Sequence, residues 1–213
     1  MLAGHYSAAF LAKALAPGLP LWILAIAVQL IDVLWAGFVI AGIEHLRVDP
    51  SLASNPLDLY DMPYTHSLLG ALGWAALAGA AVFAWRREGL ASLLVAGAVA
   101  SHWLLDWIVH RPDLLLWSGS AKHGLALWNL PVVAIGVESL LLIASAWWLL
   151  RGPRGGQGLR RGVVAITASL LAVQVVLRAL PPPIGPRAVA ASALVLFGAV
   201  AWGAWRSERR RVP

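Results

Sequence analysis

Six long apolar stretches constrain the fold of this chain more than any other feature of its sequence. A helix needs roughly 20 apolar residues to cross the hydrocarbon core of a bilayer, because each residue adds only about 1.5 Å to its length. We therefore expect an all-α, polytopic membrane protein with a single integral membrane domain over residues 1–213. The expected transmembrane helices cover residues 20–43, 66–85, 89–109, 130–150, 160–180 and 187–205.

The composition indicates lipid as the main solvent of these stretches. Hydrophobic residues make up 60% of the 213 residues and charged residues 12%, with a mean hydropathy of +0.76. Soluble domains carry roughly 25% charged residues, so an ordinary soluble enzyme is excluded. The chain has no cysteine, which excludes disulfides, iron–sulfur clusters, cysteine-ligated zinc and thiol nucleophiles. Any metal site must therefore use histidine, aspartate or glutamate.

The basic residues predict the orientation of the chain in the membrane. The net charge of +6 comes largely from arginines at positions 86–87, 151–161 and 206–211, in the connections between spans and after the last one. Basic connections stay on the cytoplasmic side, so these clusters indicate topology and not a nucleic-acid partner. The acidic loop over 44–65 and the loop after His110 are then expected to face outwards, with both ends of the chain towards the cytoplasm.

The first residues predict a short half-helix before the first span. Residues 2–16 are too short to cross the membrane, and no basic region precedes them, which argues against a cleaved signal peptide. The turn at 17–20 contains two prolines and a glycine. Lys13, just before this turn, is expected to extend to the cytoplasmic interface. We expect the half-helix to begin inside the membrane and to run to its cytoplasmic face.

Polar side chains within the spans fall at one predicted depth. An ionisable residue in a membrane span is costly and by default marks a function. Counted from the nearest cytoplasmic turn, five such positions lie about 13 or 14 residues away, which corresponds to roughly 20 Å of helix. They are His5, Asp32, His102, Glu138 and Gln174. This coincidence predicts one polar site in the outer half of the bilayer.

The third span carries the sharpest pattern. His102, Asp106 and His110 follow each other at intervals of four residues, so on a helix they form one stripe. Two imidazoles and a carboxylate suit zinc or manganese better than magnesium or calcium. The alternative is a hydrogen-bonded histidine–aspartate pair that joins two helices. His66 supplies a further ligand at the outer end of the second span, next to Thr65 or Ser67 as the helix cap.

The other candidates have more than one interpretation. Asp32 must be neutral, paired or metal-bound, because a lone carboxylate is unstable in hydrocarbon. Glu138 is a ligand, a general base or a partner that orients an imidazole. His123 either joins a second metal ion or faces solvent, and Asp113 is either catalytic or a turn residue after Pro112. Two outer cations, Arg111 and Lys122, are available to bind a phosphate group.

These motifs resemble those of the YdjM-like group of bacterial inner-membrane metal-dependent hydrolases. The resemblance covers residues 1–130, and it implies a multi-pass protein of the bacterial inner membrane. The spans that carry motifs lie within residues 1–150. The last two spans, within residues 151–213, carry none. The matching elements are His5, Asp32, Tyr64-Thr65-His66-Ser67, His102-x-x-x-Asp106 and His110-x-Pro-Asp113.

The chain also resembles, more distantly, zinc-dependent phospholipase C and the related single-strand nucleases. This resemblance implies one to three divalent ions, most simply zinc. Its ligand order implies one ion on Asp32, His66, His102 and Asp106, and a second on His110, His123 and Glu138. A third ion would be bound by His5 and Asp106 together with the amino group of the chain.

These features predict a metal-dependent hydrolase that opens to the outer face of the membrane. The ion would activate a water molecule against a phosphoester, and a lipid or lipid-linked substrate suits a site at this depth. A metal- or proton-coupled transporter is the main alternative, because transporters also place acidic groups and histidines at mid-membrane depth. A protein whose metal only fixes the helices is the third possibility.

Overall fold

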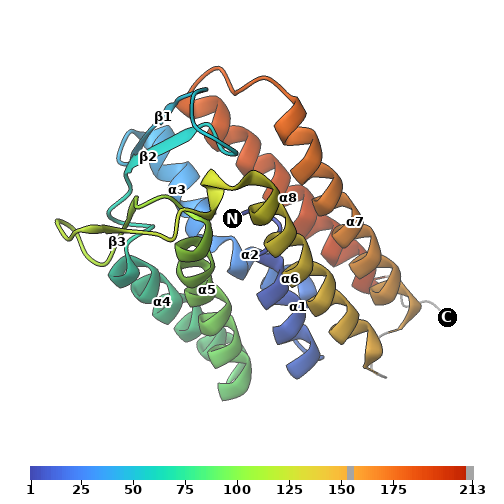
Figure 1. Ribbon diagram of the computed structural model, residues 1–213. Coiled ribbons are helices and arrows are strands. Elements are labelled where there is room, and N and C mark those ends of the chain that lie inside the picture. The colour runs from blue at the N-terminus through green and yellow to red at the C-terminus, as the bar shows by residue number, and fades with distance from the viewer. Residues whose placement is uncertain (153–155, 210–213) are drawn as a thin grey trace.

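The computed structural model describes residues 1–152 and 156–209 and shows an all-α, polytopic membrane protein (Figure 1). Five helices are long and apolar enough to cross a membrane, and a bent pair, α2 with α3, passes the same test as a sixth span. The helices are α1 (Tyr6–Leu15), α2 (Leu21–Val28), α3 (Leu30–Ala41), α4 (Leu68–Arg86), α5 (Gly89–Val109), α6 (Pro131–Arg151), α7 (Gln157–Ala179) and α8 (Pro186–Arg209), with a 3-10 turn η1 (Leu127–Asn129).

The first predicted span is wrong as a single helix. The chain bends by 55° at Gln29, between α2 and α3. No proline or glycine marks this break; instead, tertiary contacts stabilise it. The buried Gln29 side chain donates to the carbonyl of Leu2 at 3.4 Å, and His102 approaches the carbonyl of Val28 at 2.8 Å. The bend brings Asp32 towards the interior of the bundle.

Helix α1 forms the expected half-helix. The amino terminus lies among the helices near the middle of the bundle, and α1 runs from there to the turn before α2 (Figure 1). The side chain of Lys13 extends to the turn before α2 and is buried there. Its Nζ donates to the carbonyls of Pro17 and Leu19 at 2.8 and 2.6 Å and pairs with Glu208 at 2.6 Å. A tight turn leaves carbonyls without helical partners, and the ammonium group satisfies them.

The first and last parts of the chain pack together. Helix α8 contacts α2, α3 and α7, while α1 contacts α6, and α4 pairs with α5. Helix α8, which carries no motif, therefore lies against the helix that carries Asp32, and α7 packs against α8 and α6. This arrangement encloses the interior of the bundle from both halves of the chain.

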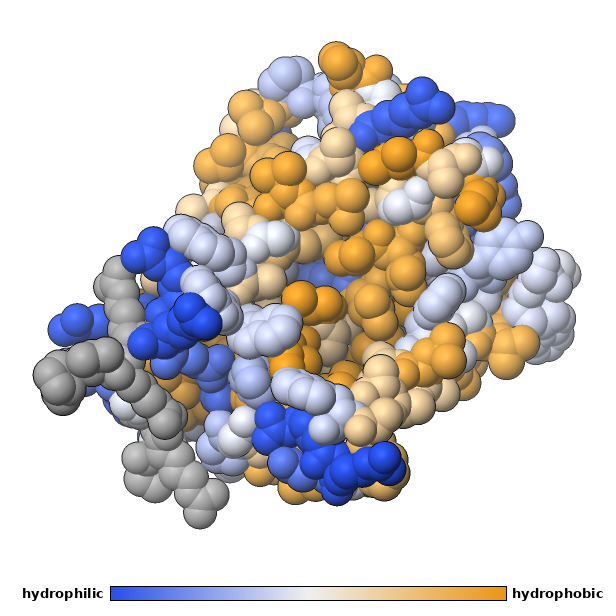
Figure 2. All heavy atoms as spheres, turned by 180° about the vertical axis from the view of Figure 1, so that it is seen from behind, coloured by the Kyte–Doolittle hydropathy of each residue, from blue (hydrophilic) through white to orange (hydrophobic). Residues whose placement is uncertain are grey.

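The loops between α3 and α4 and between α5 and α6 contain short strands that the sequence did not predict. Strands β1 (His45–Val48) and β2 (Leu57–Asp61) form an antiparallel hairpin, and β3 (Leu114–Leu115) pairs with β4 (Lys122–His123). The arginine-rich turns lie at the other end of the helices. Figure 2 shows a broad hydrophobic band on the back of the molecule, with hydrophilic side chains gathered at the top right and towards the lower left and bottom. This is the pattern of a membrane-spanning bundle.

Candidate metal centre

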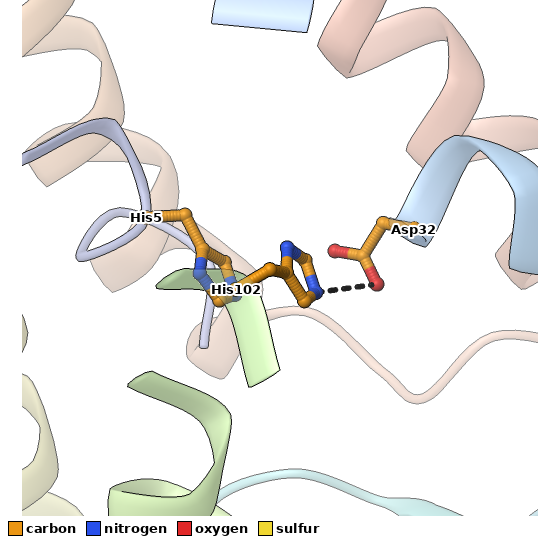
Figure 3. A group of neighbouring side chains, drawn as sticks. All are labelled: His5, Asp32 and His102. Atoms are coloured by element: carbon orange, nitrogen blue, oxygen red, sulfur yellow. Dashed lines mark ion pairs between the residues drawn. The ribbon is translucent and has the colours of Figure 1, made fainter. Parts of the chain in front are cut away.

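Six of the predicted site residues come together inside the bundle. The bend brings in a residue of α3, α5 contributes two residues on adjacent turns, and the others lie at the start of α1, before α4 and directly after α5. They are His5, Asp32, His66, His102, Asp106 and His110, all buried except for the partly buried Asp32. In Figure 3, His102 lies between His5 and Asp32.

Asp106 is the centre of the cluster. One of its oxygens lies 3.1 Å from Nε2 of His5 and 3.4 Å from Nε2 of His110, and it also contacts the amino group of Met1. The other oxygen lies 3.1 Å from Nε2 of His102 and 3.8 Å from Nε2 of His66. Both carboxylate oxygens are therefore surrounded by nitrogen atoms, so this carboxylate contacts every histidine of the cluster.

Asp32 closes the other side of the cluster. Its Oδ1 lies 3.3 Å from Nε2 of His66 and 3.5 Å from Nε2 of His102. The sets His5–Asp32–His102 and His66–His102–Asp106 each have their ligand atoms within 4.8 Å of one another. His102 belongs to both sets, so an ion held by either set would lie next to this imidazole.

In three of the histidines, Nδ1, the ring nitrogen that points away from the cluster, has a hydrogen-bond partner. Nδ1 of His102 lies 2.8 Å from the carbonyl oxygen of Val28, and Nδ1 of His110 lies 2.8 Å from Oδ1 of Asp113. Nδ1 of His66 lies 2.9 Å from the hydroxyl of Thr65. A carbonyl and a carboxylate accept, so His102 and His110 each carry a proton on Nδ1, and in the neutral imidazole Nε2 would present its lone pair to the cluster.

The orientation of His66 depends on Glu44. The hydroxyl of Thr65 donates to Oε2 of Glu44 at 2.6 Å, and Oε1 of Glu44 accepts the amide protons of Tyr64 and Thr65 at 2.8 and 2.9 Å. Since its own proton goes to Glu44, the hydroxyl accepts the Nδ1 proton of His66. Glu44 was not among the predicted site residues: the sequence placed it only in the acidic loop over 44–65, although its side chain is buried.

The nitrogen and oxygen atoms fit a metal better than they fit one another. Nε2 of His102 and both nitrogens of His5 are buried and have no hydrogen-bond partner among the described residues, although carboxylate oxygens lie close. Tetrahedral zinc ligands at bonds of about 2.0–2.1 Å lie roughly 3.3 Å from each other, and the contacts of 3.1–3.8 Å bracket that spacing. His5 also stacks on His102, with ring centroids 3.7 Å apart.

Glu138 anchors the amino-terminal segment. Its Oε2 accepts the amide protons of Leu2, Ala3 and Gly4 at 2.9, 3.1 and 3.4 Å. These contacts hold the turn that carries Met1 and His5. Of the roles considered for Glu138, the geometry favours the positioning of a ligand over that of a base.

A cavity of about 830 Å³ opens beside the cluster. Its lining includes the acidic and imidazole side chains of Asp32, His66, Asp106, His110 and Glu138. Trp35 of α3, the loop before β2, the end of α7, the proline turn at 181–183 and the first half of α8 also line it. The two helices without a motif therefore contribute a wall of the site.

Three predicted residues lie elsewhere. His123 stands on β4 opposite Leu114, and among the described residues no hydrogen bond or ion pair joins it to the cluster. Lys122 donates to the carbonyl of Tyr60 at 2.8 Å. Arg111 donates to the carbonyls of Ala53 and Asn55 and to the side chain of Asn129, and partial burial lowers the pKa of its guanidinium. Both cations thus join the loop between α5 and α6 to the loop between α3 and α4.

The sequence analysis also missed Arg178, which lines the cavity near the end of α7. A signal was present, because Arg178 follows Gln174 by four residues within the same apolar span and so shares its helix face. Gln174 itself, expected at the depth of the site, lines the cavity as well.

No protein-family model, curated protein or solved structure matches the chain. The resemblances to the YdjM-like group and to zinc-dependent phospholipase C therefore remain predictions from short motifs. Functional conclusions rest on the geometry of the cluster and its cavity.

Proposed function

We propose that this protein is a membrane-embedded, metal-dependent hydrolase that cleaves a phosphoester in a lipid or lipid-linked substrate. One observation carries the proposal: imidazole nitrogens held by acceptors on their outer side, and the carboxylates of Asp32 and Asp106, converge at the polar end of a large cavity. Fixed tautomers and shared carboxylates are typical of metal ligands, and a helix-joining ion pair needs neither.

The donor set favours zinc, with manganese as the alternative. His66, His102, Asp32 and Asp106 would hold the first ion, and Asp106 would share further ions with His110 and His5, for one to three in all. A bound divalent cation would lower the pKa of a coordinated water molecule towards about 7 and polarise a phosphoryl oxygen. His123 is left out of this proposed set because of its place on β4.

The residues around the ligands would keep the site rigid and accessible. Asp113, Thr65 with Glu44, and the carbonyl of Val28 orient the imidazoles, and Glu138 holds the segment of His5. We assign Asp113 and Glu138 positioning roles, because each acts through a histidine or its backbone.

We propose the bacterial inner membrane as the location, with the arginine-rich turns and the carboxyl terminus on the cytoplasmic side. The distribution of arginines between the two ends of the helices supports this orientation. The first helix would begin inside the bundle, so only its carboxyl-terminal end would reach the cytoplasmic face. The cavity, bordered by the outer hairpin, would then open outwards.

Metal analysis of the purified protein tests the proposal. We expect about one or more zinc or manganese ions per chain in the wild type, and loss of the metal in the His102→Ala/Asp106→Ala double variant. His45→Ala is the matched control, because His45 pairs with Asp61 on the surface. Absence of metal from the wild type, or metal retained by the double variant, would refute the metal centre. Turnover of an extracted lipid fraction, lost in the same variant, tests the hydrolase.

The broken helix supports a second candidate. Transporters place discontinuous helices at their ion sites, and the 55° bend lies three residues before Asp32. Metal flux into proteoliposomes without hydrolysis of any lipid would favour a metal-coupled transporter over the hydrolase.

A further inference from the structure

Arg178 is the one arginine or lysine among the described residues that line the cavity. Its Nη1 donates to the carbonyl of Gln174 at 2.9 Å, and its Nη2 donates to the hydroxyl of Ser54 at 3.1 Å. Its Nε is buried without a hydrogen-bond partner. Within residues 1–152 and 156–209, no carboxylate oxygen lies within 4.0 Å of the guanidinium. Arg178 therefore makes no direct ion pair within these residues, and Glu138, the carboxylate that acts on it electrostatically, lines the same cavity.

A second donor in the wall lacks an acceptor. The indole of Trp35 is buried, its Nε1 has no hydrogen-bond partner, and the residue lines the same cavity. A buried donor without an acceptor is unfavourable, because it has lost its hydrogen bonds to water. Two such donors in one cavity wall indicate a ligand that brings acceptor oxygens.

The other outer cations do not fill this role. Arg111 and Lys122 donate to backbone carbonyls, and Arg47 lies over the ring of Tyr60 at 4.6 Å. None of the three lines the cavity within the described part of the chain. A purely structural role for Arg178, as a residue that caps the end of α7, explains its bond to the carbonyl of Gln174. It does not explain why Nε is buried without an acceptor among the described residues.

The wall beside Arg178 is apolar. Helices α7 and α8 contribute Val173, Leu177, Val189, Leu196 and Phe197 to the cavity. A volume of about 830 Å³ is in the range of cavities that enclose small organic ligands. The lining of this one cavity thus contains part of the histidine–carboxylate cluster, the cation of Arg178 and an apolar wall.

We infer that the cavity binds a phosphate-bearing amphiphile, with its phosphate between Arg178 and the cluster and its hydrocarbon chain along α7 and α8. This inference rests on the proposed function and deepens it: Arg178 holds the anionic head group, and Trp35 donates to a phosphate oxygen. It also gives the last two helices a role, as the surface that binds the chain of the substrate.

Binding of dodecyl phosphate to the zinc-supplemented protein in neutral-lipid nanodiscs tests the inference by calorimetry, with empty nanodiscs as the blank. We expect Arg178→Gln to weaken binding roughly tenfold or more, because a charge-assisted contact to phosphate is lost. Arg187→Gln is the matched control. It removes the same charge at the same end of the molecule, but Arg187 is exposed and does not line the cavity within the described residues. Equal affinities of the two variants would overturn the inference.

Two further probes keep the test valid if Arg178→Gln does not fold. Dodecanol has the same chain without the phosphate, and the wild type should bind it at least tenfold more weakly than dodecyl phosphate. Inorganic phosphate lacks the chain, and it should also bind more weakly. If dodecanol bound as tightly as dodecyl phosphate, the cavity would not recognise the phosphate. If inorganic phosphate bound as tightly, the apolar wall would not bind the hydrocarbon chain. Either result would overturn the inference.

The outcome is separable from that of the proposed function. Dodecyl phosphate binding through Arg178 without turnover of any lipid would end the hydrolase proposal and leave the binding site. Lipid turnover with no effect of Arg178→Gln on binding or on KM would end this inference alone.

Discussion

Oδ1 of Asp113 lies 2.8 Å from Nδ1 of His110, while Nε2 of the same ring lies 3.4 Å from Asp106. The imidazole therefore stands between two carboxylates, one in the cluster and one outside it. A carboxylate on the outer nitrogen fixes the tautomer and the orientation of a ligating histidine.

Replacing the outer carboxylate tests this relationship. We expect Asp113→Ala to weaken zinc affinity roughly 10- to 100-fold, because His110 loses its fixed tautomer. Competition with a fluorescent chelator measures the effect. The control is Asp61→Ala, which breaks a His–Asp contact of 2.7 Å on the surface and should leave zinc affinity unchanged. Equal zinc affinity in the two variants would contradict the role of Asp113.

Glu44→Gln should invert the proton arrangement at His66. A glutamine amide would donate to the Thr65 hydroxyl, which would then donate to Nδ1 and move the imidazole proton to Nε2. We expect zinc affinity to fall roughly 10- to 100-fold, with a loss of about 2 kcal/mol in the free energy of unfolding. Nitrogen-15 NMR of the histidines reads the tautomer directly.

A surface glutamate provides the comparison for Glu44. Glu88 pairs with Arg86 at 3.0 Å and is more than half exposed. Glu88→Gln should change neither the tautomer of His66 nor zinc affinity. An unchanged Nδ1–H tautomer in Glu44→Gln would show that Thr65 alone sets the orientation of His66.

The helices were predictable because membrane spans have a required length. The third span was expected over 89–109, and α5 covers these residues, since charged and proline-containing turns mark its ends. The depth of the polar side chains in the membrane was predictable because each helical residue adds a fixed rise. Counting from the cytoplasmic turns placed His5, Asp32 and His102 at one level, and the structure brings them together.

The lateral arrangement could not be predicted. Every face of a helix in lipid is apolar, so periodicity does not reveal which faces pack together. The bend at Gln29 has no proline or glycine signal, since contacts with Leu2 and His102 stabilise it. Glu44 looked like a loop carboxylate because its partners, the amides of Tyr64 and Thr65, are backbone groups.

The ion pair between the buried Lys13 and the partly buried Glu208 predicts a change in stability without a change in metal binding. Glu208→Gln leaves the ammonium group of Lys13 without its anion, and we expect a loss of about 3 kcal/mol in the free energy of unfolding. The Lys13→Met/Glu208→Leu double variant should recover most of this loss. Thermal unfolding in detergent measures both variants, and a loss of zinc in either would show that this pair is coupled to the cluster.

The absence of cysteine allows a direct test of orientation. Ser118→Cys places a single thiol in the exposed turn between β3 and β4, and Glu88→Cys places one in the exposed turn between α4 and α5. Because basic connections remain in the cytoplasm, we expect a membrane-impermeant maleimide to label Ser118→Cys in intact spheroplasts. Glu88→Cys should react only after the membrane is permeabilised. The reverse pattern would place the cavity on the cytoplasmic side and require a cytoplasmic source of substrate.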